Sequence, residues 1–218
     1  MSGICGICQP GVTPERSRLD VMLEAHSVLP GIRFSSSLGP SIALGVAQRW
    51  ELQALADIPG IRIAVDADLV NVDELRKLLN SEGIPVPEAS IAEVIAYLYV
   101  WRGPEFLSML RGTFAIALWD EKVQRLLLAI DRLGVQSLYW SVRSDGLFFS
   151  SRSSSIVAAQ DGPATVNPVA VVQFLILSCV PAPMSIYAGV ERLRPGQCDD
   201  ERREEQNEQR EFDGAGLP

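Results

Sequence analysis

The segment that most constrains the fold runs from Leu110 to Ser150, where short apolar runs alternate with polar breaks. β-Branched, aromatic or leucine-rich runs between breaks rich in Asp, Gly and Ser are typical of consecutive β-hairpins. The runs show little alternation of apolar and polar residues, which indicates strands that are covered on both faces. We therefore expect an antiparallel meander inside a layered fold, with strands at 113–119, 125–130, 137–142 and 147–150.

The meander also carries three motifs in a fixed order. They are GTFAIALWD at 112–120, DRLGV at 131–135 and LYW at 138–140. Their order and spacing resemble those of the glutaminase domain of glutamine-hydrolysing asparagine synthetases, where a G-x-F-A-x-A-L-W-D strand is followed by D-R-L-G-x-x-P-L-Y-Y. The resemblance covers residues 2–197 and ends before residue 198.

The resemblance implies the fold of an N-terminal-nucleophile hydrolase. This is an α+β fold, a four-layer αββα sandwich in which two antiparallel sheets lie between helix layers. It implies a glutaminase-like domain at 1–165, the start of a connection to a synthetase domain at 166–197, and a tail at 198–218. The tail is charged and lacks apolar periodicity, so we expect it to be disordered and unrelated to the family. We expect the chain to be truncated before its synthetase half.

Outside the meander, the sequence predicts a helix over 14–27 and a loop over 29–39, then strands at 41–50 and 61–65. Asn71 is the expected N-cap of a helix that Gly83 ends. Ser90 and Glu93 form a capping-box pattern before a helix that reaches Trp101. Short helices are expected at 104–110 and within 151–160, and another begins at Pro168, after Asn167.

The charge and composition exclude several classes of partner. The formal net charge is −8, and eight acids against three arginines in 198–218 contribute −5 of it. We therefore expect no nucleic acid to bind. Neither a signal peptide nor an apolar run long enough to cross a bilayer is visible, which indicates a cytoplasmic protein without membrane contact.

The nucleophile position is altered relative to the family. Its glutaminases begin, after removal of Met, with Cys-Gly-Ile-x-Gly-Ile, and the thiol and α-amine act as nucleophile and base. The register that keeps both Gly-Ile pairs places Ser2 there, and a hydroxyl is a poorer nucleophile than a thiol near neutral pH. A second alternative places the nucleophile at Cys5 after cleavage of a leader. A third makes Cys5 and Cys8 a redox or zinc pair, although two small core cysteines explain the spacing more simply.

The other glutamine-site positions are altered as well. The family's Asn-Gly-Glu-x-x-Asn segment supplies oxyanion donors from its Asn side chain and Gly backbone, and it aligns with 66–71. Asp66 and Ala67 therefore take the places of these donors, and a carboxylate repels an oxyanion. The family's aspartate that pairs with the glutamine α-amine falls on Ile91. Arg49 is a counterpart of the arginine that binds the substrate carboxylate, although a surface arginine at a strand end explains it equally well.

These differences lead to a main hypothesis and two alternatives. The main hypothesis is a glutamine amidotransferase-like domain that lacks glutaminase activity and serves a structural role for a synthetase half that forms an amide, lactam or peptide ring. The first alternative is an active glutamine amidohydrolase that delivers ammonia, with Ser2 as its N-terminal nucleophile. The second is a non-functional fragment with an exposed apolar face.

The same reasoning sets the expected cofactors and partners. ATP and Mg²⁺ would belong to the missing synthetase domain, because no phosphate-binding motif is visible, and we expect no cofactor for this chain. The expected partner is a synthetase domain or chain, with a homodimer as a further option and glutamine as a ligand only of an active enzyme.

Overall fold

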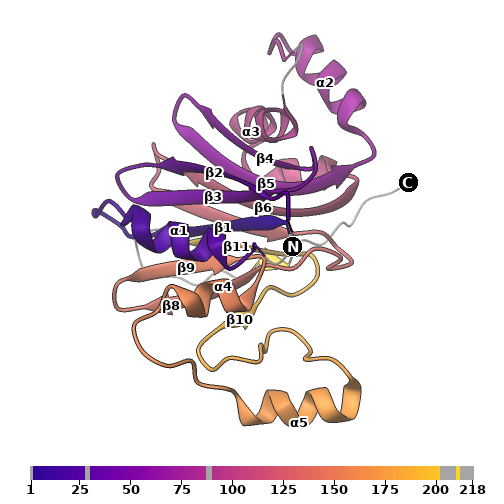
Figure 1. Cartoon of the computed structure of the whole chain (residues 1–218). Helices are drawn as coiled ribbons and strands as arrows, with labels where there is room; N and C mark the ends of the chain where they lie inside the picture. The colour runs from indigo at the N-terminus through magenta and orange to yellow at the C-terminus, as the bar shows by residue number, and fades with distance from the viewer. Residues whose placement is uncertain (1, 28–29, 87–89, 202–209, 212–218) are drawn as a thin grey trace.

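Two antiparallel sheets of six strands each form the centre of the protein. Their arrangement is known from a computed structural model that describes residues 2–27, 30–86, 90–201 and 210–211 (Figure 1). In sheet order, the first sheet consists of β10 (Glu191–Arg192), β8 (Tyr139–Arg143), β9 (Gly146–Ser150), β1 (Gly3–Cys8), β3 (Ile42–Gln48) and β2 (Arg33–Leu38). The second consists of β12 (Arg210–Glu211), β11 (Gln197–Glu201), β7 (Arg125–Ile130), β6 (Gly112–Asp120), β5 (Ile61–Leu69) and β4 (Gln53–Ile58).

Helices cover the outer face of each sheet. The first sheet packs against α1 (Arg16–Glu24) and α4 (Ser153–Ala158). The second packs against α2 (Val72–Ser81), α3 (Ile91–Arg102) and the 3₁₀ helix η1 (Gly103–Met109). The last helix, α5 (Pro168–Leu177), lies apart from these layers at the lower end of the molecule in Figure 1.

The strand residues supply three apolar layers by simple alternation. On β1, Ile4 points into the core between the sheets, whereas Cys5 and Ile7 point toward α1 and α4. On β6, Ala115 and Ala117 face the other sheet, and the intervening Ile116 packs beneath α3 with its neighbours. This alternation is the ordinary consequence of the two-residue period of a strand. It confirms the predicted α+β sandwich of two antiparallel sheets between helices.

Gly6 explains why the glycine-rich N-terminal strand suits the centre of the first sheet. β1 pairs with β3 on one side and with β9 on the other. A Cβ on Gly6 would meet the ring of Phe149 and the carbonyl oxygen of Ala43, which lies 2.6 Å away. A larger residue therefore cannot occupy this position without displacing a neighbouring strand.

Several helix predictions are confirmed. Leu19, Met22 and Leu23 of α1 are buried, as its spacing indicated. Ser90 and Glu93 make both hydrogen bonds of a capping box, with distances of 3.3 Å and 2.7 Å. Asn167 accepts from the backbone N–H groups of two residues in the first turn of α5.

One prediction about local structure is wrong, one strand was missed, and one N-cap is confirmed in position but not in its side-chain hydrogen bond. The expected loop over 29–39 contains β2, whose polar sequence is compatible with a half-exposed edge strand. β4 was not predicted, because its sequence is only weakly apolar. Asn71 is the N-cap residue of α2 but does not cap it. Its side chain instead donates to the Met109 carbonyl and accepts from the Arg111 N–H, so it joins two loops.

The predicted disorder of the tail is also wrong where the structure describes that segment. Residues 198–201 continue β11 and pair with β7, from Cys198 opposite Ala129 to Glu201 opposite Leu126. β12 contributes residues 210–211. Backbone hydrogen bonds to an open strand edge require no apolar pattern in the added strand, which explains the failure. The remainder of 198–218 lies outside the described residues.

Candidate functional site

The predicted site positions meet at one end of the sandwich. Gly3 of β1 pairs with Ala47 of β3, so Ser2 and the residues that follow β3 lie at the same strand ends. Residues 49–52 then carry the chain from the first sheet to β4 in the second. β4 begins with Gln53, which pairs with Asp66 of β5. The structure therefore brings the strand ends that carry Ser2, Arg49 and Asp66 to one region.

The side chain of Gln53 holds this region together. Its Oε1 accepts hydrogen bonds from the backbone N–H of Arg49 at 3.2 Å and of Trp50 at 3.0 Å. Its Nε2 donates to Asp66 Oδ1 at 2.8 Å. Gln53 is 2% exposed, so these bonds replace water around a buried amide. The sequence argument did not single out this residue, although an amide side chain that directly follows an inter-sheet loop can satisfy both donors and acceptors there.

Asp66 lies in a poor environment for negative charge. It is 6% exposed, and burial raises its carboxyl pKa, while the hydrogen bond from Gln53 partly opposes that shift. A carboxylate accepts hydrogen bonds and cannot donate them. In its ionised form Asp66 therefore cannot stabilise the oxyanion that forms when an amide is attacked.

Ala67, the second predicted oxyanion-donor position, has a backbone N–H that is already hydrogen-bonded within the protein. The Ala67 N–H donates to the Leu52 carbonyl at 2.9 Å, which ties β5 to the inter-sheet loop. Ala67 is fully buried and packs beneath the helices of the second sheet. Its N–H consequently already has a partner within the protein.

Arg49 lies beyond the end of β3 and is exposed. Its guanidinium lies over the indole of Trp50, with 5.2 Å between the guanidinium carbon and the ring centroid. Among the residues that the structure describes, Arg49 forms no salt bridge. The side chain is therefore accessible to an anionic group, which fits both explanations given for it above.

The two cysteine alternatives receive no support from the geometry. Ser2 is half-buried immediately before β1, whereas Cys5 lies inside β1 and is fully buried. Burial raises the pKa of the Cys5 thiol far above its ordinary value, which keeps it protonated and unreactive. Cys8 points into the core between the sheets, away from Cys5. The two side chains therefore cannot form one redox or metal site.

Residues that were not singled out as a group fill the space beneath the start of β1. His26 is fully buried, and its Nε2 lies 3.0 Å from Ser150 Oγ. Ser151 Oγ accepts from the Ile4 N–H at 3.0 Å. A Cβ on Gly3 would lie 2.6 Å from the Ser151 Cβ and 3.2 Å from the His26 ring. The His26 and Ser150 side chains are fully buried, so this pair positions the strand rather than offering a base to a substrate.

Ile91 takes the position where the family resemblance places the aspartate that binds the glutamine α-amine. Ile91 is the first residue of α3 and packs against the apolar layer beneath the second sheet. An isoleucine offers neither charge nor a side-chain acceptor for an ammonium group.

Asp131, which is 2% exposed, accepts from the N–H groups of Leu133, Val135 and Gln136 and so organises the turn of the DRLG motif.

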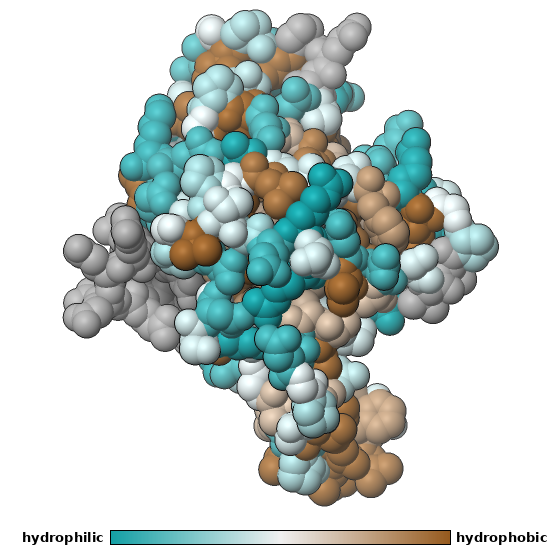
Figure 2. All heavy atoms as spheres, turned by 60° about the vertical axis from the view of Figure 1, so that its left-hand side comes forward, coloured by the Kyte–Doolittle hydropathy of each residue, from teal (hydrophilic) through white to brown (hydrophobic). Residues whose placement is uncertain are grey.

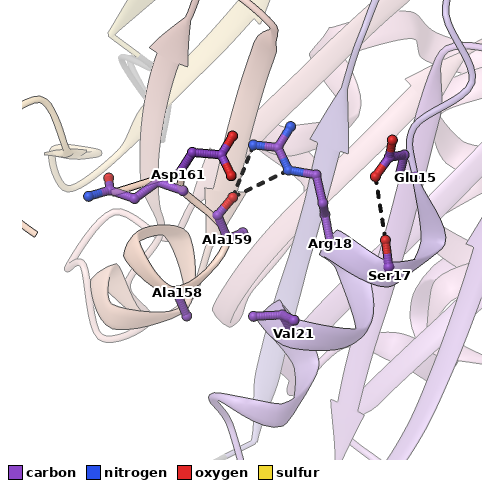
Figure 3. A pocket seen from close by; sticks show the side chains of 8 residues that line it. Glu15, Ser17, Arg18, Val21, Ala158, Ala159 and Asp161 are labelled. Atoms are coloured by element: carbon purple, nitrogen blue, oxygen red, sulfur yellow. Dashed lines mark hydrogen bonds between the residues drawn. The ribbon is translucent and has the colours of Figure 1, made fainter. Parts of the chain in front are cut away.

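A hollow of about 360 Å³ lies between α1 and α4, away from these residues (Figure 3). Arg18 crosses it and donates from Nε and Nη2 to the Ala159 carbonyl, at 3.3 Å and 3.0 Å. Its Nη1 donates to Asp145 at 2.5 Å. Glu15 and Asp161 add acidic groups to the lining. Because Arg18 is already paired, the hollow is a joint between two helices and not a prepared anion site.

The comparisons with known proteins agree with this architecture. The family described as a glutamine amidotransferase domain matches residues 53–212. The match thus includes Asp66 and Ala67, leaves out Ser2 and Arg49, and continues past residue 197, where the resemblance was expected to end.

Two curated relatives are much longer than the segment they share with this chain. Asparagine synthetase [glutamine-hydrolyzing] 3 of Bacillus subtilis is 31% identical over 134 residues, which are 61% of this chain and 22% of that protein. Amidase chry2 of Gibberella zeae is 32% identical over 152 residues, or 68% of this chain and 22% of that protein. The chain therefore spans about a fifth of the length of the curated relatives it matches.

A solved structure shows the same fold. Glutamine phosphoribosylpyrophosphate amidotransferase from B. subtilis, complexed with ADP and GMP, superposes with a TM-score of 0.66. The superposition covers 97% of this chain and 49% of that one, at 17% sequence identity.

Proposed function

Because the chain belongs to the glutamine amidotransferase domain family and is related to the asparagine synthetases, we propose that it is a glutaminase-like domain without glutaminase activity. Its role is structural: it packs against a synthetase half that forms an amide, lactam or peptide ring. ATP and Mg²⁺ are ligands of that half and not of this domain.

The proposal rests on the hydrogen bonds that the two predicted oxyanion-donor positions already make within the protein. Asp66 presents a buried carboxylate whose hydrogen bond comes from Gln53, and the Ala67 N–H already donates to Leu52. Removal of one oxyanion donor costs on the order of 3–4 kcal/mol of transition-state stabilisation in a working enzyme. Ser2 at the nucleophile position and Ile91 at the amine-binding position compound that loss.

The first experiment measures glutamate release from glutamine by the purified protein beside Ser2→Ala. The proposal expects equal and negligible release from both proteins. Release by the wild type that Ser2→Ala abolishes would instead establish an active glutamine amidohydrolase with Ser2 as nucleophile.

A restored variant provides a positive control for the assay. It combines Ser2→Cys, Asp66→Asn, Ala67→Gly and Ile91→Asp, which replace the altered positions with the groups that the chemistry requires. Measurable release by this variant would show that the scaffold positions the site and that these substitutions account for the inactivity.

A further inference from the structure

The helix α5 exposes an unusual amount of apolar surface. Its sequence, PVAVVQFLIL, contains one polar side chain, and Ala170 is its one fully buried residue. Leu175 is 77% exposed and Ile176 is 74% exposed. Figure 2 shows this surface as the apolar projection at the lower end of the molecule. The remaining exposed apolar residues of the helix are Val169, Val172, Phe174 and Leu177.

These side chains surround most of the helix. Val172, Leu175 and Ile176 follow the i, i+3, i+4 spacing and share the face opposite Ala170. Val169 lies beside that face, and Phe174 lies four residues after Ala170 on the opposite side of the helix; both are about half exposed. A helix that is apolar nearly all round is normally enclosed by other protein. The surface of α5 therefore fits a groove that wraps around it better than a flat contact.

Backbone hydrogen bonds join the segments at the two ends of α5 to each other. Val166 bridges to Tyr187, the Asn167 N–H donates to Ile186, and the Ala188 N–H donates to Thr165. These contacts join the segments before and after the helix. The exposed apolar side chains are consequently presented on an anchored helix.

We propose that α5 is the docking helix for a synthetase-type partner chain, which encloses it in an apolar groove. This inference rests on the structural role proposed above and names the surface that performs it. The matched relatives extend this domain with about four-fifths of their length, and those proteins are larger synthetases. A large additional domain is the kind of partner that can form a groove deep enough for a helix with apolar side chains on nearly all sides.

Two other occupants fit the helix less well. A second copy packed through α5 about a twofold axis would bury one face of each helix and leave the others exposed. A bilayer surface favours a helix with a strongly polar opposite face, which α5 lacks. No helix in the described part of the chain is long and apolar enough to span a membrane.

The test measures the affinity of the full chain for the synthetase-type chain that is encoded in the same genome and purified separately. Leu175→Ser combined with Ile176→Ser should weaken binding by at least about tenfold, because both side chains would leave an apolar groove. The matched control combines Val70→Ser with Leu133→Ser, whose side chains are 83% and 82% exposed outside α5. The control should bind within about twofold of the wild type. Thermal unfolding of both variants verifies that they are folded.

Cys179 supplies a second readout that needs no substitution in the helix. It is the exposed cysteine of the four, and it lies two residues after the end of α5. Its alkylation should slow at least about tenfold when the partner is bound, since a docked helix shields its end from reagent.

Several results would overturn the inference. The inference fails if that genome encodes no synthetase-type chain. It also fails if the α5 variant and the control lose the same affinity, or if Cys179 is alkylated at the same rate in the complex as in the free chain. A dimer of the chain alone that the α5 variant dissociates would identify a second copy as the occupant, and α5-dependent vesicle binding would identify a lipid surface. The glutamate assay is independent: Ser2-dependent release together with α5-dependent docking would overturn the proposed inactivity and keep the docking site.

Discussion

Gln53 donates a hydrogen bond from Nε2 to Asp66 Oδ1 over 2.8 Å, and this bond joins the start of β4 to the end of β5. The other end of the same amide binds two backbone N–H groups of the loop that connects the sheets. One side chain therefore both fixes the crossing between the sheets and pairs with the carboxylate at the predicted oxyanion-donor position.

Replacement of Gln53 by alanine should lower the free energy of unfolding by about 2–3 kcal/mol. The substitution leaves the buried Asp66 carboxylate and the part-buried N–H groups of Arg49 and Trp50 without this partner. Denaturant titration measures the effect. Gln48→Ala, at the end of β3, is the matched control and should change stability by less than about 1 kcal/mol. Equal effects of the two substitutions would show that the Gln53 hydrogen bonds contribute nothing specific.

Asp66→Asn should stabilise the protein at neutral pH. Burial raises the pKa of the folded-state carboxyl, so the folded state binds more protons than the unfolded state between the ordinary and the raised pKa. Wild-type stability therefore falls as pH rises through that window, whereas an amide has no such dependence and still accepts from Gln53. The advantage of the variant should vanish below about pH 4. Asp68→Asn, at the exposed residue two positions along β5, is the control. A variant less stable than the wild type at neutral pH would refute this account.

Asp145→Asn should have the opposite pH dependence. The hydrogen bond from Arg18 lowers the pKa of the Asp145 carboxyl, so ionisation of this group stabilises the folded state. That contribution is present above the ordinary Asp pKa and is lost as pH falls through the lowered one. The pair is partly exposed, so the loss at neutral pH should stay below about 1 kcal/mol and shrink in high salt. An effect that persists in acid would point to packing instead of charge.

Gly6→Ala should destabilise the protein by about 3 kcal/mol or prevent folding. The added Cβ would overlap the ring of Phe149 and the Ala43 carbonyl in the centre of the first sheet. Gly11 has a φ of +77° and open space around its missing Cβ. Gly11→Ala should therefore cost only about 1 kcal/mol, from backbone conformation alone. Thermal unfolding compares the two, and similar melting temperatures would contradict the steric explanation.

The meander and the layered fold were predictable because the residues that carry them are apolar and local. The runs that became β6 and β7 are buried on both faces, and the Ser90 capping box determines where α3 begins. β2 and the start of β11 were missed for a physical reason. Both are joined through backbone hydrogen bonds, and their polar sequences carry little of the apolar pattern on which the prediction depends.

The strand ends that carry the predicted site residues could be placed from the sequence, whereas the hydrogen bonds of those residues could not. The family resemblance predicts that Asp66 and Ala67 take the oxyanion-donor positions, and the structure shows that Asp66 accepts from Gln53 and that the Ala67 N–H donates to Leu52. Such partners cannot be inferred from a linear sequence, because they lie across the loop between the sheets. The exposure of α5 was similarly hidden, since an apolar helix of ten residues is ordinarily a core helix.

The hydrogen bonds at the base of α5 close its segment into a loop whose two ends meet at the sandwich. A segment closed in this way can change its sequence with little effect on strand pairing elsewhere. Under the proposed docking role, the sequence of α5 would determine the partner, whereas the two sheets and their helices would determine the stability of the domain. Selection could redirect the domain to a different synthetase through ten residues, while the sandwich that carries them stays the same.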